Sequence, residues 1–302
     1  MQITKKAWEE RINSLRAQEE ELIISRGEII RILAAKIEQT VLSQAEKALK
    51  QGKIGVLFSG GVDSTLITHI LKKNNIDFHS VTIGFQDNEE QKLPEDIEEA
   101  REASSTLQIN NVEKILSFKE IKEVFKETIE ILGKDLANVV NVGVGSVEFS
   151  GIQELKKIDS EITQIFCGLG SEEIFAGYHR HKQADNKHEE CWNGLKGMYE
   201  RDLLRDFAIS KKLKIEFWTP FLDEELISLS MNIPIKYKLN DEENKIVLRE
   251  AAIILGLPQK FSFRPKRAAQ YGSRTDKALE KLAKQNGYKY KKDYITYILN
   301  SK

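Results

Sequence analysis

Apolar runs alternate with amphipathic stretches over the first half of the chain. Four short runs are rich in β-branched and aromatic residues, as buried strands are, and they span residues 53–58, 78–85, 112–116 and 163–167. Three stretches between them repeat their apolar positions every three or four residues, as helices do, and they span residues 64–73, 96–107 and 121–132. This alternation predicts a parallel sheet covered by helices, an α/β fold.

The two ends of the chain show helical patterns only. Residues 1–50 are predicted to be helical throughout, with Ile30, Leu33 and Ile37 on one face. Beyond Gly168 the pattern predicts helices and loops and no strand. We therefore expect three parts, an amino-terminal helical segment at 1–50, a central domain at 51–273 and a basic, Tyr/Lys-rich carboxyl-terminal helix at 274–302.

The composition is typical of a globular protein. The chain has 302 residues, of which 40% are hydrophobic and 31% charged, enough for one large domain with a helical lobe. No run approaches the ~18 apolar residues of a membrane span, and the start, MQITKKAWEERINSL, lacks the apolar core of a signal peptide. Cys167 and Cys191 form no disulfide pattern. We expect a cytoplasmic location and no membrane partner.

The charge is concentrated near the carboxyl terminus. The net charge is −1, but residues 260–302 contain twelve Lys/Arg against three Asp/Glu. Such a segment is a solvated basic face or a surface that meets phosphate, in a nucleotide or a nucleic acid.

The segment SGGVDS (59–64) lies between the first predicted strand and the first predicted helix. In a parallel sheet, ligands bind beyond the carboxyl ends of the strands. Glycines let backbone N–H groups approach an anion, and the helix N-terminus adds partial positive charge. The glycines are Gly60 and Gly61, and hydroxyl donors come from Ser59, Ser64 and Thr65. Asp63 would repel bare phosphate, so this loop predicts a phosphate site with a bound cation, Mg²⁺.

Several segments resemble one known family. SGGVDS lacks the Walker A and G-x-G-x-x-G patterns and resembles the pyrophosphate loop of the ATP pyrophosphatases. CGLGSEEIFAGYHRHK (167–182) resembles the SGEGSDELFGGY segment of asparagine synthetases, and TPFLDEELISLSMNIP (219–234) resembles their PFLD segment. KIVLREAAIILGLP (245–258) and FRPKRAAQYGS (263–273) resemble their closing region. The order agrees over about three quarters of the chain, so the sequence resembles the synthetase domain of the asparagine synthetase family.

The resemblance implies a fold and a reaction. The fold is an adenine nucleotide alpha hydrolase-like (PP-loop) parallel sheet with a helical carboxyl-terminal lobe. ATP is cleaved between its α and β phosphates, which leaves AMP on the substrate and releases pyrophosphate. The implied cofactors are ATP and Mg²⁺, and the implied substrates are a small-molecule carboxylate and ammonia or an amine.

The resemblance also assigns site residues. Asp63 and Glu172 stand where the family holds the metal, and Lys266 matches a lysine near the phosphates, so these three are the expected catalytic residues. Leu57 and Ile83 match residues that flank the adenine. The full set expected to bind ATP is Leu57, Ser59, Gly60, Gly61, Asp63, Ser64, Ile83, Gly168, Gly170 and Lys266.

Simpler explanations stay open for several of these residues. Leu57 and Ile83 fit a packed core, and Glu172 fits a favourable acid in the first turn of a helix. Lys266 fits a solvated basic face. Asp96 matches a family acid near the nucleotide and equally fits a helix cap.

The amino terminus departs from the family. Members that make asparagine carry a glutaminase domain with a catalytic cysteine directly after the initiator methionine. Gln2 stands in that place, and only 51 residues precede the matched region. We therefore expect a stand-alone synthetase, supplied by free ammonia, by an amine or by a separate glutaminase subunit in trans.

The acceptor side departs as well. The first Glu of SGEGSDE is implicated in handling aspartate and ammonia, and Leu169 stands there. Trp218 replaces an arginine that precedes PFLD, whereas Glu216 is retained. We infer that adenylation is kept and that the acceptor has changed.

Two polar clusters have open interpretations. The first cluster contains His179, His181, His188 and Cys191, and it is either a zinc site or a polar segment without a metal. The second cluster contains Tyr288, Tyr290, Tyr294 and Tyr297, with lysines between them. Its rings either stack on RNA bases or pack a terminal helix against the domain.

The leading functional hypothesis is an ATP-dependent amide-forming ligase. One alternative is a non-catalytic nucleotide-binding regulatory protein, which Leu169 and Trp218 favour. The other is a tRNA-modifying PP-loop enzyme, for which the basic carboxyl terminus is the only support, so we do not expect a nucleic-acid partner.

Overall fold

A five-stranded parallel sheet forms the centre of the computed structural model, which describes residues 3–88, 92–265 and 268–301. The strand order is β3-β2-β1-β4-β5, and every neighbouring pair is parallel. The strands are β1 (Lys53–Leu57), β2 (His79–Phe85), β3 (Asn111–Leu116), β4 (Ile162–Phe166) and β5 (Glu216–Trp218). The predicted α/β fold with a parallel sheet is confirmed.

Hydrophobic side chains form two clusters, one on each face of the sheet. Successive side chains of a strand point to opposite faces, and accordingly Val56 belongs to the first cluster and Leu57 packs on the second. The long helices of the first cluster are α1 (Lys5–Ala17), α2 (Arg26–Leu49), α3 (Val62–Lys73), α4 (Glu95–Leu107), α9 (Lys187–Met198), α11 (Glu224–Met231) and α13 (Ile246–Ile254). Those of the second are α5 (Phe118–Leu136), α6 (Val139–Ile158), α10 (Leu204–Leu213), α16 (Thr275–Gln285) and α17 (Lys291–Asn300).

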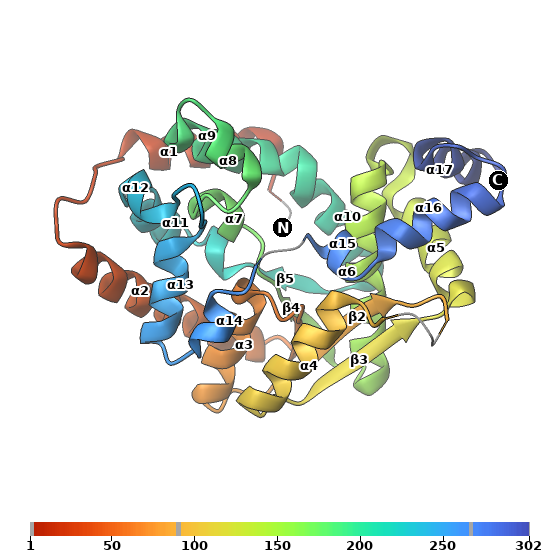
Figure 1. The fold of residues 1–302 in the computed structure, drawn as a ribbon, viewed down its shortest axis with the longest axis horizontal. Helices are drawn as coiled ribbons and strands as arrows, with labels where there is room; N and C mark the ends of the chain where they lie inside the picture. Colours follow the sequence, from red (N-terminus) through yellow and green to blue (C-terminus); the bar gives the residue numbers. More distant parts are fainter. Residues whose placement is uncertain (1–2, 89–91, 266–267, 302) are drawn as a thin grey trace.

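The short helices of the described chain all follow β4 in sequence. They are α7 (Ser171–Ile174), α8 (His179–Gln183), the π-helix η1 (Tyr199–Leu203), the 3-10 helix η2 (Pro220–Leu222), α12 (Ile235–Lys238), α14 (Gln259–Ser262) and α15 (Ala269–Gly272). Figure 1 shows the sheet in the middle, with α5, α16 and α17 at one end and α1, α2, α11 and α12 at the other. The chain after β4 is almost entirely helical, as the predicted carboxyl-terminal lobe requires.

Three predictions about elements were wrong. Residues 1–50 are not helical throughout, because α1 ends at Ala17 and α2 starts anew with a capping box between Ser25 and Glu28. A strand does follow Gly168, the three-residue edge strand β5. The carboxyl-terminal segment contains two helices, α16 and α17, where one was expected.

The helix α6 was not foreseen. Its sequence opens VVNVGVGS, in which valines and glycines weaken a helical pattern. Its glycines allow close packing, since a Cβ at Gly151 would lie 2.9 Å from Leu57 Cδ2 and one at Gly145 would lie 3.3 Å from Thr128 Cγ2. The helix therefore packs tightly against the sheet and against α5.

In residues 3–88, 92–265 and 268–301, no helix combines the length and the apolar character needed to cross a bilayer.

Candidate functional site

The loop after β1 has a conformation that its glycines permit. Gly60 has a left-handed backbone, with φ at 69°, and a Cβ there would lie 2.7 Å from both Ala100 N and Arg264 Nη1. Gly61 caps α3 with an extended backbone and without a side-chain bond. The first N–H groups of α3 therefore face outward from the carboxyl end of β1, where an anion is favoured.

Hydroxyl groups complete this loop. Ser59 Oγ and Ser64 Oγ are 3.2 Å apart, the Gly61 N–H donates to Ser59 Oγ at 3.4 Å, and the Ser59 N–H donates to Ser64 Oγ at 3.2 Å. Thr65 is fully buried and does not join them at the cavity. Ser59 is the hydroxyl residue of the loop that lines the cavity, and Ser64, which is buried and not part of the lining, lies behind it in contact with Ser59 Oγ.

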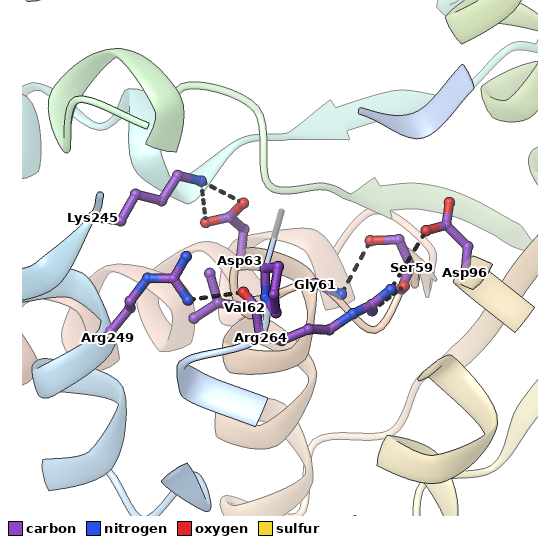
Figure 2. Close-up of a pocket in the computed structure, with 9 residues that line it drawn as sticks. Ser59, Gly61, Val62, Asp63, Asp96, Lys245, Arg249 and Arg264 are labelled. Atoms are coloured by element: carbon purple, nitrogen blue, oxygen red, sulfur yellow. Dashed lines mark hydrogen bonds and ion pairs between the residues drawn. The ribbon is translucent and has the colours of Figure 1, made fainter. Parts of the chain in front are cut away.

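A small cavity opens in front of the loop (Figure 2). Its walls come from the loop and α3, from α4, from the start of α13 and from the segment after α14. The lining residues are Ser59, Gly61, Val62, Asp63, Asp96, Lys245, Arg249, Arg264 and Pro265. Segments far apart in the sequence therefore converge on the predicted phosphate loop.

Asp63, Glu172 and Lys245 meet at one point of the site. Lys245 Nζ lies 2.8 Å from both Asp63 carboxylate oxygens and forms an ion pair with Glu172. Burial lowers the pKa of Lys245, but the two carboxylates outweigh burial and raise the pKa overall, so the ammonium stays charged. Gly168 allows the approach of α3, because a Cβ there would lie 2.6 Å from Asp63 Cβ.

The donor set at this point suits Mg²⁺. Mg²⁺ is usually bound by one or two carboxylates together with phosphate oxygens. Asp63 and Glu172 already share a cation, the ammonium of Lys245, which shows that their oxygens converge on one position. When bound with ATP, the metal would neutralise charge on the phosphates.

Arginines fix the other wall of the cavity. Arg264 Nη1 donates to the Ser59 carbonyl at 2.9 Å, and its guanidinium pairs with Glu99 at 3.2 Å and with Asp96 at 3.8 Å. Arg249 Nη1 donates to the Arg264 carbonyl at 2.9 Å. Asp96 lies in the first turn of α4, and the N-cap position of this helix is held by Pro94, which has no side-chain bond there.

The remaining predicted residues lie differently. Leu57 and Ile83 face Gly151 of α6, and neither lines the cavity. Gly170 has φ at 97°, and a Cβ there would lie 2.4 Å from Leu222 Cδ2, so it serves packing at the start of α7. Lys266 lies outside the residues that the structure describes.

Lys245 and Arg249 were missed as functional residues. Both fall in the segment KIVLREAAIILGLP, where a spacing of four predicts one helix face, whereas the structure places Lys245 just before α13, at its N-cap with a left-handed backbone. A basic pair on one face of a matched segment was the available signal. What the pair contacts depends on α3 and α7, which are distant in the sequence.

Apolar side chains pack against Leu169 and Trp218, the two residues at which the sequence departs from the family that it resembles. Trp218 stacks on Phe166 with ring centroids 6.1 Å apart, and its indole N–H donates to Gln164 Oε1 at 2.8 Å. Leu169 packs against the first hydrophobic cluster. The Cys167 N–H donates to the Trp218 carbonyl at 3.1 Å, which places β5 directly beside the 167–170 loop.

A buried charged cluster lies next to this loop. Arg205 is 3.2 Å from Glu148, 2.7 Å from Asp206 and 3.4 Å from Asp202. Asp202 belongs to the π-helix η1 and stands three residues before Arg205 of α10, a spacing that places both side chains on one helix face. Burial raises the pKa of the Cys167 thiol, and the nearby carboxylates of Asp206 and Glu148 raise it further.

This cluster predicts a specific pH dependence of stability. Burial raises the pKa of Glu148 to about 8. Between the ordinary glutamate pKa, about 4.3, and about 8, the folded state binds more protons than the unfolded state, so stability falls as the pH rises. Glu148→Gln removes this loss, and we expect its melting temperature relative to wild type to be about 5–10 °C higher at pH 8 than at pH 5.

Thermal unfolding of both proteins over this pH range measures the effect. Glu127→Gln, on the exposed face of α5, is the control and should show a constant difference from wild type. A Glu148→Gln difference that does not change with pH would show that Glu148 is charged in the folded state.

The structure does not support a zinc site. In the described parts of the chain no three His, Cys, Asp or Glu side chains come together as metal ligands. His181 Nδ1 accepts from the Tyr178 N–H at 3.1 Å, whereas His188 contacts Glu19. The histidines therefore serve different local contacts.

The carboxyl-terminal tyrosines largely contact one another. Tyr288, Tyr294 and Tyr297 have ring centroids 5.4–6.5 Å apart, and Tyr294 is buried. Tyr290 is 52% exposed and lies beside Lys289 and Lys292. Tyr288 and Tyr294 thus pack against neighbouring rings, whereas Tyr297 is 49% exposed, much as Tyr290 is.

Comparison with known proteins fits this geometry. The family model for asparagine synthase matches residues 33–193 and 184–293. The chain belongs to the asparagine synthase family. A putative glutamine-hydrolysing asparagine synthetase of Methanocaldococcus jannaschii is 28% identical over 279 residues, which are 80% of this chain and 49% of that protein. An asparagine synthetase domain-containing protein of Saccharomyces cerevisiae is 27% identical, over 82% of this chain and 52% of its own.

The chain thus spans about half the length of the curated relatives it matches. Among solved structures, the NMN synthetase of Francisella tularensis aligns over 92% of this chain and 94% of its own, with a TM-score of 0.41 and 12% identity, a similarity too low to bear on function. Membership of the asparagine synthase family supports ATP use and amide formation at the level of the family.

Proposed function

We propose that the chain is an ATP-dependent amide-forming ligase. A carboxylate is adenylated with release of pyrophosphate, and ammonia or an amine then displaces AMP to form the amide. One observation carries the proposal, namely that the glycine loop at 59–64 presents Asp63 to Glu172 and Lys245 in a member of the asparagine synthase family.

The described residues suit the handling of a triphosphate. The first N–H groups of α3 and the Ser59 hydroxyl supply hydrogen-bond donors. Asp63 and Glu172 would hold Mg²⁺. Positive charge for the separating pyrophosphate would come from Arg264 at the cavity wall and from Lys266.

The proposed acceptor is a carboxylate other than aspartate. Leu169 offers neither a charge nor a hydrogen bond, and Trp218 is held by Phe166 and Gln164. The nitrogen donor is free ammonia, an amine, or ammonia from a separate glutaminase subunit. Its substrates are small molecules, and we propose a cytoplasmic location for the reaction.

A nucleotide product assay tests the proposal. The full chain with ATP, Mg²⁺ and ammonium is presented with a panel of carboxylates, and pyrophosphate release is followed. We expect AMP and pyrophosphate in equal amounts, and no ADP, because the loop and its metal site face the α and β phosphates in the proposed reaction. Asp63→Asn is the matched control and should lose most of this release.

The assay also separates the alternatives. Formation of ADP and phosphate would contradict the proposal. ATP binding without pyrophosphate release on any carboxylate would favour the regulatory protein, and release that requires tRNA would favour the RNA-modifying enzyme.

A further inference from the structure

A lysine ammonium lies between the two carboxylates that suit the metal (Figure 2 shows it beside Asp63). Lys245 Nζ is 2.8 Å from both Asp63 oxygens, pairs with Glu172, and donates to Ser171 Oγ at 3.0 Å. The Lys245 side chain is 1% exposed, and those of Asp63 and Glu172 are 19% and 8% exposed. One positive charge is thus shared by two carboxylates in an enclosed place.

The backbone around Lys245 holds it there. Lys245 has φ at 55°, a left-handed conformation that side-chain-bearing residues rarely adopt. The side-chain amide of the preceding residue, Asn244, donates to the Gly177 carbonyl at 2.6 Å, and Arg249 Nε donates to the backbone carbonyl of Asn244 at 2.8 Å. A Cβ at Gly177 would lie 2.0 Å from Glu172 Oε2 and 2.4 Å from Lys245 Cε. The contact is therefore built into the fold.

A free divalent cation and this ammonium compete for the same oxygens. Mg²⁺ needs direct contact with carboxylate oxygens, and it would be repelled by an ammonium a few ångströms away in an enclosed site. ATP changes this balance, because its phosphates add negative charge that both cations can share. Lys245 lines the cavity in front of the phosphate loop and so has such a partner within reach.

We propose that Lys245 closes the Asp63–Glu172 pair to free divalent cations, so that the metal binds only together with nucleotide. The inference rests on the proposed ATP site and adds an order of binding to it. Lys245 acts as an internal counter-ion in the absence of ATP and moves to the phosphates when ATP and metal enter.

Direct binding of Mn²⁺ tests the inference. The full chain without nucleotide is titrated with Mn²⁺ alone, and the loss of the free-ion electron paramagnetic resonance signal is recorded. We expect Lys245→Met to bind one Mn²⁺ at least ~10-fold more tightly than wild type, because the competing charge is removed. Lys245→Arg keeps the charge and should resemble wild type.

Two further variants make the test specific. Lys238→Met is the matched control, because Lys238 is also fully buried but contacts Met231 Sδ at 3.8 Å, and it should leave the Mn²⁺ affinity unchanged. Adding Asp63→Asn to Lys245→Met should cancel the gain, since one of the two carboxylates is then lost.

Equal Mn²⁺ affinity of wild type and Lys245→Met would overturn the inference. If that variant does not fold, nucleotide-free wild type and Asp63→Asn decide: both should bind Mn²⁺ with the same weak affinity, because Lys245 already closes the pair in wild type, and a loss of Mn²⁺ affinity in Asp63→Asn would overturn the inference. Failure of the proposed function would be seen elsewhere, as the absence of pyrophosphate release with every carboxylate while the nucleotide-free Mn²⁺ comparison stands.

Discussion

Replacing Lys266 with alanine is expected to slow pyrophosphate release by about 10²–10³-fold, the usual effect of removing one group that stabilises developing charge. Lys266 directly follows Pro265, which lines the cavity beside the phosphate loop. In the proposed reaction, negative charge develops on pyrophosphate as it leaves, so the loss should fall on turnover. The ATP affinity should change far less, and single-turnover rates together with calorimetric ATP binding measure the two effects.

Lys260→Ala is the matched control for this prediction. Lys260 belongs to the same basic segment, but its side chain is 50% exposed and pairs with Glu102 on the surface. It should turn over like wild type. If Lys266→Ala also keeps the wild-type rate, Lys266 belongs to the solvated basic face of the segment and not to the reaction.

Local patterns account for most of the sheet. Four strands lie where short apolar runs predict them, because each run is rich in β-branched or aromatic residues and is bounded by turn residues. The strands β1, β2 and β4 are largely buried, whereas β3 lies at the edge of the sheet and is partly exposed. The strand β5 could not be predicted from such a run, since three residues at the edge of a sheet are too few to show the two-residue alternation of a strand. The helix α6 was not predicted, because the glycines that its close packing requires weaken the helical pattern of its sequence.

The candidate site also has a part that a local sequence pattern predicts and a part that it does not. The glycine loop is formed by consecutive residues, so the segment 59–64 by itself predicted that the loop lies between a strand and a helix. Lys245 contacts Asp63 across 182 residues of sequence, and Arg205 reaches Glu148 across 57. Such contacts follow from how α3, α6, α10 and α13 pack, and no pattern within one segment contains them.

Asparagine formation from aspartate is expected to be orders of magnitude slower than the ~1 s⁻¹ of a slow ordinary enzyme. An acidic side chain at position 169 handles aspartate and ammonia in the family that the sequence resembles. Leu169 packs against apolar neighbours and cannot take a proton or hold an ammonium. The measurement supplies aspartate, ATP, Mg²⁺ and ammonium at saturating concentrations and quantifies asparagine, with ATP binding checked on the same sample.

Leu169→Glu alone should not restore the activity in full. Trp218 stands where the resemblance places an arginine of the family, and it stacks on Phe166 and donates to Gln164, so this side chain supplies no positive charge. A glutamate at 169 would regain the acid without regaining the positive charge that an aspartate carboxylate requires. Turnover near ~1 s⁻¹ in the wild-type chain would show that Leu169 does not exclude aspartate. Far slower turnover beside intact ATP binding directs the search for the acceptor to less polar carboxylates.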